Sequence, residues 1–224
     1  VTGVQTCALP ISDAAAINFL AAGVSASDVF TVTVTDGKVA SPTTAEFRID
    51  VTGANESPTL SSVAPLTGGV EDTDYTISYA TLVAATDAAD RDNLVLSFRI
   101  EAISSGTLTK GGTAVVAGTT ILGPSESLVW RPALNANGMV KAFTITAWDG
   151  TVASATPLQV IVAVNAVNDA PVLSAIAING TEDLPVSFAA AKFTDNYTDV
   201  EGSPMVSLTV VTLPASGTLK LSGN

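Results

Sequence analysis

The residues of this chain that could do chemistry are mostly carboxylates. The 224 residues include no histidine and a single cysteine, Cys7. Histidine is the commonest general base and transition-metal ligand, and Ser-His-Asp and Cys-His catalysis both require it, so these mechanisms are excluded. Oxygens of Asp, Glu and Asn are instead the ligands of Ca²⁺, which takes about six to eight of them. Clustered carboxylates of this kind would therefore suit calcium.

Acidic residues recur at matching places along the chain. A Glu-Asp pair with a later group of acidic residues occurs twice, as Glu71-Asp72 with Asp87, Asp90 and Asp92, and as Glu182-Asp183 with Asp195, Asp199 and Glu201. Ordinary solvated turns are the alternative interpretation, because Asp and Asn favour turns through local hydrogen bonds. Carboxylate pairs also serve glycosidases. A catalytic pair need occur only once, whereas these recur, so we expect no enzyme active site.

Two tryptophans offer a second kind of chemistry. Trp130 and Trp148 could form a platform on which sugar rings stack. A lone tryptophan on a strand more often packs in the core, where its large apolar surface is buried. We therefore expect packing, with sugar binding as the alternative.

The charge balance argues against nucleic acids and membranes as partners. The formal net charge is −12, from 21 acidic and 9 basic residues, whereas phosphate backbones and anionic membrane surfaces attract clusters of Lys and Arg. Only 13% of residues are charged and 47% are hydrophobic, so the composition is that of a folded chain. No apolar run approaches the roughly 18 residues that span a bilayer, and we expect no membrane insertion.

An internal repeat organises the chain. Residues 30–61 align without a gap to residues 143–174 at an offset of 113, and 14 of those 32 positions are identical. The match continues at an offset of 111, where the SGTL of 105–108 recurs at 216–219. A unit of about 110 residues is too long for a short solenoid repeat and suits an independent β-sandwich.

Within each unit the apolar residues alternate with polar ones, as strands with one solvated face require. Phe30, Val32 and Val34 alternate with threonines, and the same pattern occurs in 47–51 and 94–101. Asp-Gly dipeptides at 36–37 and 149–150 separate pairs of such strands. A tight hairpin turn favours Asp-Gly because glycine accepts a positive φ. The pattern predicts two antiparallel sheets packed face to face, with Phe143 and Ile145 inside.

The repeat divides the chain into four segments. Residues 1–11 (VTGVQTCALPI) resemble a translated sequencing adapter and are excluded from the fold prediction. Residues 12–57 are then expected to be the C-terminal part of one repeat, 58–170 a complete repeat, and 171–224 the N-terminal part of a third. Because Cys7 lies in the excluded segment, the rest of the chain has no thiol and no disulfide.

The linkers between the repeats read ANESP at 54–58 and VNDAP at 167–171. With the Asp-Gly turn, the final strand and the Glu-Asp pair that follows, they resemble bacterial cadherin-like repeats and the related VCBS-type repeats of giant secreted surface adhesins. The resemblance covers 12–224. It implies an all-β chain of tandem Greek-key β-sandwich repeats, of cadherin or immunoglobulin-like type, with calcium at the junctions.

The resemblance also implies which residues bind calcium. At the first linker they are Asn55, Glu56, Asp90 and Asp92, with Asp149 of the Asp-Gly turn nearby. At the second linker they are Glu71 or Asp72, then Asn168 and Asp169, then Asp199 and Glu201. The second linker is the closer match, because the first has a Glu where VNDAP has an Asp.

The function implied by this resemblance is a calcium-dependent adhesion or stalk segment of a large repetitive bacterial surface protein. Its expected location is extracellular, at the cell surface. Its expected partners are the neighbouring repeats of the same chain, and a cell-surface protein or a glycan. The alternative is a non-catalytic spacer or binding module of a large secreted hydrolase, and the sequence does not separate the two.

Overall fold

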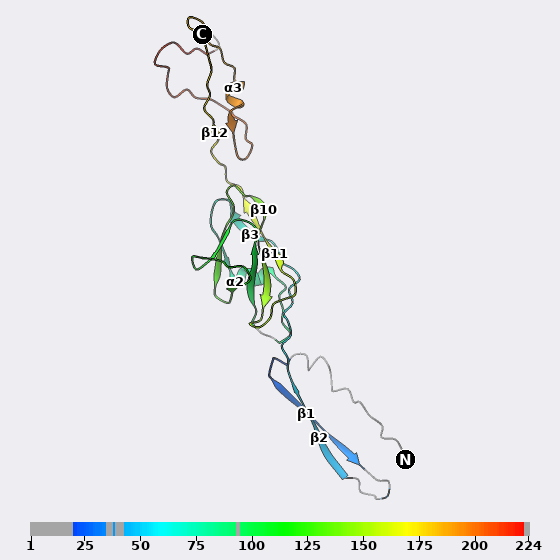
Figure 1. The fold of residues 1–224 in the computed structure, drawn as a ribbon. Coiled ribbons are helices and arrows are strands. Elements are labelled where there is room, and N and C mark those ends of the chain that lie inside the picture. The colour runs from blue at the N-terminus through cyan, green and yellow to red at the C-terminus, as the bar shows by residue number, and fades with distance from the viewer. Residues whose placement is uncertain (1–19, 35–37, 39–42, 93–94, 222–224) are drawn as a thin grey trace. The chain divides into compact units, whose positions relative to one another are not determined.

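The computed structural model describes residues 20–34, 38, 43–92 and 95–221. The chain forms two compact units, Val1–Ala166 and Val167–Asn224, and each is described by itself. Strands make up most of the regular structure, and the two helices of the described part have only seven and four residues. The chain is therefore all-β, as the alternating pattern predicts (Figure 1). The adapter-like segment 1–11, with Cys7, lies outside the described residues.

The first two strands form an antiparallel hairpin. Strands β1 (Ser25–Val34) and β2 (Thr43–Thr52) pair along their whole length, with Phe30 opposite Phe47. The ring centroids of these two phenylalanines lie 5.0 Å apart. Both side chains therefore lie on one face of the hairpin. The Asp-Gly dipeptide at 36–37, predicted to form its turn, lies outside the described residues.

The middle of the chain contains two further sheets. One has five strands in the order β3-β11-β10-β5-β8, and the other has four in the order β4-β9-β6-β7. The strands of the first sheet are β3 (Leu66–Val70), β5 (Ser97–Ile103), β8 (Ile121–Leu122), β10 (Gly138–Trp148) and β11 (Leu158–Asn165). Those of the second are β4 (Tyr75–Ser78), β6 (Thr107–Lys110), β7 (Thr113–Ala114) and β9 (Ser127–Arg131). All pairs are antiparallel except β11 with β3.

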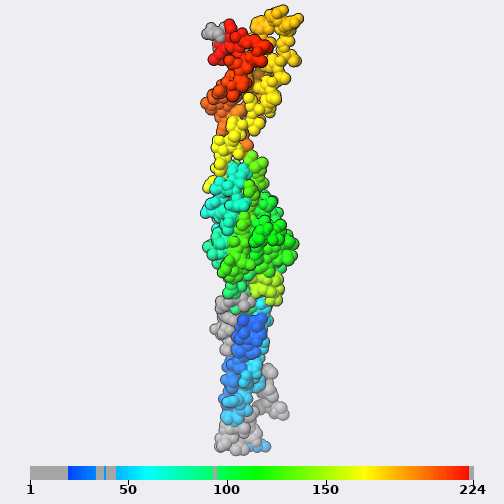
Figure 2. Space-filling model, turned by 90° about the vertical axis from the view of Figure 1, so that its left-hand side faces the viewer, coloured from blue at the N-terminus to red at the C-terminus, as the bar shows by residue number. Residues whose placement is uncertain are grey.

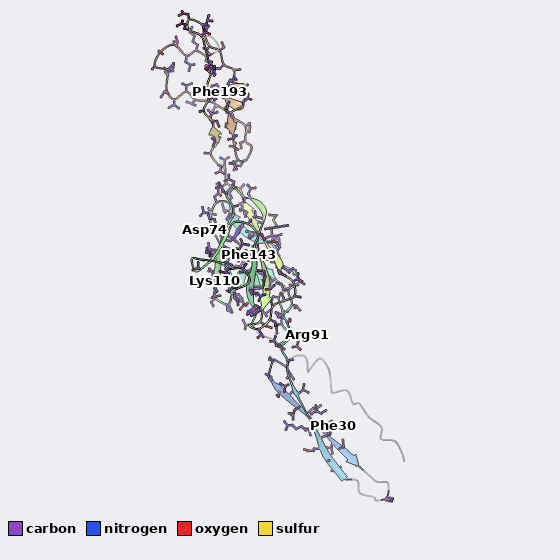
Figure 3. All side chains as sticks on the ribbon, in the orientation of Figure 1. Phe30, Asp74, Arg91, Lys110, Phe143 and Phe193 are labelled. Atoms are coloured by element: carbon purple, nitrogen blue, oxygen red, sulfur yellow. The ribbon has the colours of Figure 1, made fainter. Side chains whose placement is uncertain are left out.

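Side chains from both sheets form one hydrophobic core. Phe143 and Ile145 of β10 are fully buried, as predicted, in the same cluster as Trp130 of β9 (Figure 3). The indole N–H of Trp130 donates to the Ser105 carbonyl at 2.9 Å, so this buried ring keeps its polar atom satisfied. Sugar stacking on Trp130 is thereby excluded. The guanidinium of Arg99 lies 4.8 Å from the ring centroid of Trp148 and covers that ring.

The Asp-Gly turn that follows β10 has the local chemistry expected of it. The Asp149 carboxylate accepts hydrogen bonds from the backbone N–H groups of Thr151 and Val152, at 2.6 and 2.7 Å. Gly150 has a φ of +103°, a conformation that a residue with a side chain rarely adopts. The turn therefore fixes the position of the Asp149 carboxylate.

A short helix that the alternating pattern did not predict follows β4. Helix α2 (Tyr79–Ala85) begins after Ser78, whose hydroxyl accepts a hydrogen bond from the Thr81 N–H at 3.1 Å. Such a cap satisfies one of the N–H groups left without a partner at a helix start. Leu82 is the buried residue of this helix. No helix in the described part of the chain is long and apolar enough to cross a membrane.

The second compact unit has little regular structure. Strand β12 (Val172–Leu173) pairs with β13 (Tyr197–Thr198), and helix α3 (Ala191–Thr194) lies between them in the sequence. The rings of Phe188 and Phe193 meet edge to face at 5.8 Å. Large apolar side chains remain exposed, among them Val206 and Val211, at 94% and 89%. This unit therefore buries much less apolar surface than the sandwich.

Candidate metal site

The first linker contacts the Asp-Gly turn. The side-chain amide of Asn55 donates to Asp149 Oδ2 at 2.9 Å and to the Glu56 carbonyl at 3.2 Å. The two residues lie 94 positions apart in the sequence. The turn after β10 and the linker after β2 therefore meet at one place in the first compact unit.

The same linker also contacts the acidic loop that follows α2. The Glu56 N–H donates to Asp92 Oδ2 at 3.2 Å, and the Asp92 N–H donates to Asp90 Oδ1 at 2.7 Å. A chain of hydrogen bonds thus connects Asp149, Asn55, Glu56, Asp92 and Asp90. These are the five residues that the sequence assigned to the first linker, and their metal-binding role stays a prediction.

Three carboxylate oxygens in this group are shielded from solvent and accept no hydrogen bond from any described residue. They are Glu56 Oε2, Asp90 Oδ2 and Asp92 Oδ1. Asp92 as a whole is only 5% exposed. A buried charged oxygen without a partner is costly, and such atoms are rare in native proteins unless they have an unseen water or ion. Each of these oxygens therefore has room for a partner that a water or an ion would supply.

The neighbouring Asp92 side chain disfavours the charged form of Glu56. The hydrogen bond that a protonated Glu56 shares with Asp92 is the largest cause that raises the pKa of Glu56 above its usual value, followed by burial and by the negative charge of Asp92, while the nearby Arg91 acts in the opposite direction. A carboxyl whose charged form is disfavoured by another carboxylate gains from any cation that enters between them. Arg91 is exposed and only partly offsets this repulsion (Figure 3).

Asp149 is held in its charged form. Burial acts to raise the pKa of Asp149, but the hydrogen bonds from the Asn55 side chain and from the Val152 and Thr151 amides outweigh it and keep the pKa below its usual value. The group therefore offers carboxylate oxygens and an amide, with no nitrogen or sulfur ligand. A donor set made of oxygens suits Ca²⁺.

The first compact unit holds two of the residues assigned to the second linker. Glu71 is 2% exposed, its N–H donates to the Asn165 carbonyl at 3.0 Å, and its Oε2 accepts from the Asn137 side chain at 3.1 Å. Asp72 has a φ of +57°, and its Oδ1 accepts from the Asn135 N–H at 3.0 Å. Glu71 is therefore the buried one of these two acidic residues. Its N–H is hydrogen-bonded to Asn165, the last residue of β11.

The second compact unit holds the remaining residues. The Asp169 N–H donates to Glu201 Oε2 at 3.3 Å, and the Asn168 side chain donates to the Asp169 carbonyl at 2.8 Å. Asp199 Oδ1 accepts from the Ser203 N–H at 2.8 Å. Glu201 therefore contacts the linker of this unit, as Asp92 does at the first linker, whereas the contact of Asp199 lies within its own loop.

One residue of these contacts, Asn137, was not identified from the sequence, and one acidic residue that the sequence pattern singled out, Asp87, has other partners. Asn137, which donates to Glu71, lies 66 positions away, and no local pattern distinguishes it. Asp87 was grouped with Asp90 and Asp92, but its carboxylate accepts from the N–H groups of Ser61 and Ser62, both at 2.9 Å. The hydrogen bond from the Ser61 hydroxyl, followed by those from the two N–H groups, holds the pKa of Asp87 well below its usual value. Asp87 therefore has a structural partner that accounts for it.

Comparisons with known proteins identify no family. No protein-family model matches the chain, and no curated protein matches it. Two solved structures of the endo-fucoidan hydrolase MfFcnA4 from glycoside hydrolase family 107, one of them a single-residue variant, are similar to it with a TM-score of 0.32 each. Their identities to this chain are 21% and 22%. Each match covers 67% of this chain and 20% of the other.

Proposed function

We propose that this chain is a calcium-stiffened stalk or adhesion segment of a large extracellular bacterial surface protein, built from tandem Greek-key β-sandwich repeats of the cadherin-like and VCBS type. The observation that carries this proposal is the set of three shielded, unpartnered carboxylate oxygens on Glu56, Asp90 and Asp92. They lie where one repeat is expected to pass into the next. The role is mechanical and adhesive, with no catalytic step.

Residues of the first linker would hold the calcium ion. Glu56, Asp90 and Asp92 would supply charged oxygens, and Asp149 and Asn55 are hydrogen-bonded to the same group. Bound calcium would neutralise carboxylates that otherwise repel one another. Because these residues come from the linker, from the loop after α2 and from the turn after β10, the ion would tie three separate segments together.

A second calcium ion is proposed at the next linker. Glu71 is bonded to Asn165, and Asp169, only four residues further along the chain, is bonded to Glu201. Four extended residues span at most about 14 Å, so the chain itself keeps Glu71 within reach of this pair. These three carboxylates are the proposed ligands, as the linker resemblance implies. Calcium there would join the end of one repeat to the start of the next.

The surrounding chemistry supports an extracellular stalk more than an enzyme. The chain has no histidine and a formal charge of −12, and each candidate ligand set recurs along the chain. Recurrent acidic junctions suit a module that is repeated to set length and stiffness. The expected partners are neighbouring repeats, with a cell-surface protein or glycan as the adhesion target.

Small-angle X-ray scattering of the whole chain tests the stalk role. We expect the distribution of interatomic distances to narrow in about 5 mM calcium, which exceeds the affinities typical of extracellular calcium modules, relative to the same sample with a chelator. Magnesium at the same concentration is the matched control, because it keeps its own waters and fits oxygen cages poorly. Identical profiles with calcium and with chelator would contradict the proposal.

A further inference from the structure

The loop that joins β9 to β10 ends in an Asn-Gly dipeptide. Asn137 and Gly138 are both exposed to solvent, and Gly138 is the first residue of β10. Gly138 has a φ of +79°, and a Cβ placed on it would meet no atom within 4 Å. Figure 2 shows the part of the chain that includes this loop, drawn in green, at the molecular surface. Water therefore reaches the dipeptide, and no side chain crowds the backbone nitrogen of Gly138 from its own residue.

The side-chain amide of Asn137 has a buried carboxylate as its partner. Its Nδ2 donates to Glu71 Oε2 at 3.1 Å, and more weakly to the Asn135 carbonyl at 3.4 Å. Glu71 is only 2% exposed, so an amide donor satisfies a charge that solvent barely reaches. A carboxylate in place of this amide would remove the donor and set two like charges side by side, which disfavours the charged form of both.

We propose that Asn137 is a site of spontaneous deamidation, which converts the partner of Glu71 from an amide into a carboxylate. Asparagine is a labile residue, and a following glycine makes it more so. Glycine has no side chain to crowd the attacking nitrogen, and its backbone adopts more conformations than that of any other residue. The sequence has two Asn-Gly dipeptides, at 137–138 and 179–180. The one at 137–138 adjoins a buried carboxylate, so its conversion has a structural consequence.

The reaction needs one water molecule and no other reactant. The backbone nitrogen of Gly138 attacks Cγ of Asn137, the N–Cγ bond forms, and the Cγ–Nδ2 bond breaks. Nδ2 leaves as ammonia with the proton that the backbone nitrogen gives up. Water then opens the five-membered succinimide ring: its hydroxyl adds to one ring carbonyl carbon, the bond from that carbon to nitrogen breaks, and the nitrogen takes the remaining proton. Opening at Cγ gives aspartate, and opening at the main-chain carbonyl carbon gives isoaspartate.

Either product places a new carboxylate beside Glu71. Each event adds one negative charge to a chain whose formal net charge is already −12. The backbone of Glu71 is held by the Asn165 carbonyl at 3.0 Å, which limits how far the residue moves away from the added charge. The folded chain should therefore lose stability in the absence of metal. Calcium would relieve the repulsion by taking both carboxylates as ligands, and this last step alone rests on the proposed function.

Peptide mass spectrometry of the aged full chain tests the conversion. The chain is incubated in mildly alkaline buffer with chelator, which favours loss of the backbone proton and excludes calcium. Asn135 is the matched internal control, because it lies in the same loop and is followed by Ala136. Conversion at Asn137 should be faster by roughly tenfold or more, the factor that a barrier difference of about 1.4 kcal/mol gives. Gly138→Ala, for which the loop has room, should remove most of this difference.

Melting temperatures in chelator test the contact with Glu71. Asn137→Asp reproduces the aspartate product and should melt below the unchanged chain at pH 7. The exchange variant, Glu71→Gln with Asn137→Asp, sets an amide opposite a carboxylate again and should recover most of the loss. With the Glu71→Gln single variant these chains form a double-mutant cycle, which isolates the energy of the pair. A misfolded Asn137→Asp chain would not be recovered by a second substitution.

Two results would overturn the proposal. The first is conversion at Asn137 that is no faster than at Asn135, or that occurs in denaturant but not in the folded chain. The second is an exchange variant that melts no higher than Asn137→Asp. Calcium separates this inference from the proposed function, because the melting temperature should rise more on adding calcium for Asn137→Asp than for the unchanged chain. If calcium raised neither, the proposed function would fail while the deamidation site stood. If it raised both equally, the added carboxylate would not be a ligand.

Discussion

The Glu56 N–H donates to the Asp92 carboxylate at 3.2 Å. The same contact recurs at the second linker, where the Asp169 N–H donates to Glu201 at 3.3 Å. At the first linker the N–H donor belongs to a Glu and the accepting carboxylate to an Asp. At the second linker the donor belongs to an Asp and the accepting carboxylate to a Glu. The Asn that precedes each pair also repeats its own contact, bonding to the carbonyl of the next residue. Each linker therefore combines one Glu with one Asp.

This exchange predicts how the first linker responds to substitution. Glu56→Asp leaves two short acidic side chains and should weaken calcium binding by about tenfold, or about 1.4 kcal/mol. The double change, Glu56→Asp with Asp92→Glu, reproduces the residues of the second linker and should restore most of the affinity. Calorimetric titration of Glu56→Asp, of Asp92→Glu and of the double variant measures both effects. If the losses simply added in the double variant, the two side chains would not share a ligand.

The raised pKa of Glu56 predicts a pH dependence in the absence of calcium. The folded chain holds this proton more tightly than the unfolded chain, so the stabilisation is present below the usual value of 4.5 and is lost as the pH rises through the raised pKa. Glu56→Gln keeps the shape and removes the charge. In chelator this variant should melt at a higher temperature than the unchanged chain at pH 7, and the difference should shrink near pH 4.

Glu126 provides the control for that experiment, because its pKa is shifted in the opposite direction. The hydrogen bond from Lys110 is the largest cause that lowers the pKa of Glu126, so its stabilisation is present above the usual value of 4.5 and is lost as the pH falls through the lowered pKa. Glu126→Gln should therefore lower the melting temperature at pH 7. If Glu56→Gln and Glu126→Gln shifted the melting temperature at pH 7 in the same direction, the unfavourable contact between Glu56 and Asp92 would be contradicted.

Asp87 should affect stability without affecting calcium. Asp87→Asn weakens the bonds to Ser61 and Ser62, so the melting temperature at pH 7 should fall. Because the pKa of Asp87 is lowered, its stabilisation is lost as the pH falls below the usual value of 3.8, and the variant and the unchanged chain should converge there. The rise in melting temperature on adding calcium should be unchanged. A reduced calcium response would make Asp87 a ligand.

The core of the sandwich provides a prediction about stability alone. Phe143 is fully buried, and Phe143→Ala should cost roughly 3 to 5 kcal/mol of unfolding free energy. Leu134 is 82% exposed, and Leu134→Ala should change it by less than about 0.5 kcal/mol. Chemical denaturation of the two variants measures the difference. If Phe143→Ala lowered the unfolding free energy by less than about 1 kcal/mol, the face of β10 that carries Phe143 would be exposed to solvent.

The strands and the turn could be predicted from the sequence because their signals are local. Alternation with a period of two fixes which residues share a face, and it placed Phe143 and Ile145 correctly in the core. The same alternation assigned Phe47 to a covered face, yet Phe47 is 52% exposed. The pattern identifies the apolar face of a strand, whereas its burial depends on strands elsewhere in the chain.

Less of the candidate site than of the fold could be predicted from the sequence. The recurring linkers identified Asn55 and Glu56 as a pair, because the repeat preserves their order. The contact between Glu71 and Asn137 joins residues 66 positions apart through the tertiary fold, so no spacing rule could find it. Helix α2 was missed because its seven residues are too few to show a helical period.

Calorimetric titration of the full chain with calcium tests the central claim most directly. The unchanged chain should bind calcium, and Asp92→Asn, which keeps the shape of the side chain and removes its charge, should lose at least one ion per chain. Glu126→Gln is the matched control, since Glu126 is an exposed partner of Lys110 that belongs to neither linker group, and it should titrate like the unchanged chain. If no heat of binding appeared up to about 10 mM calcium, well above the affinities of extracellular sites, or if Asp92→Asn bound as many ions as the unchanged chain, the three shielded oxygens would not form a calcium site.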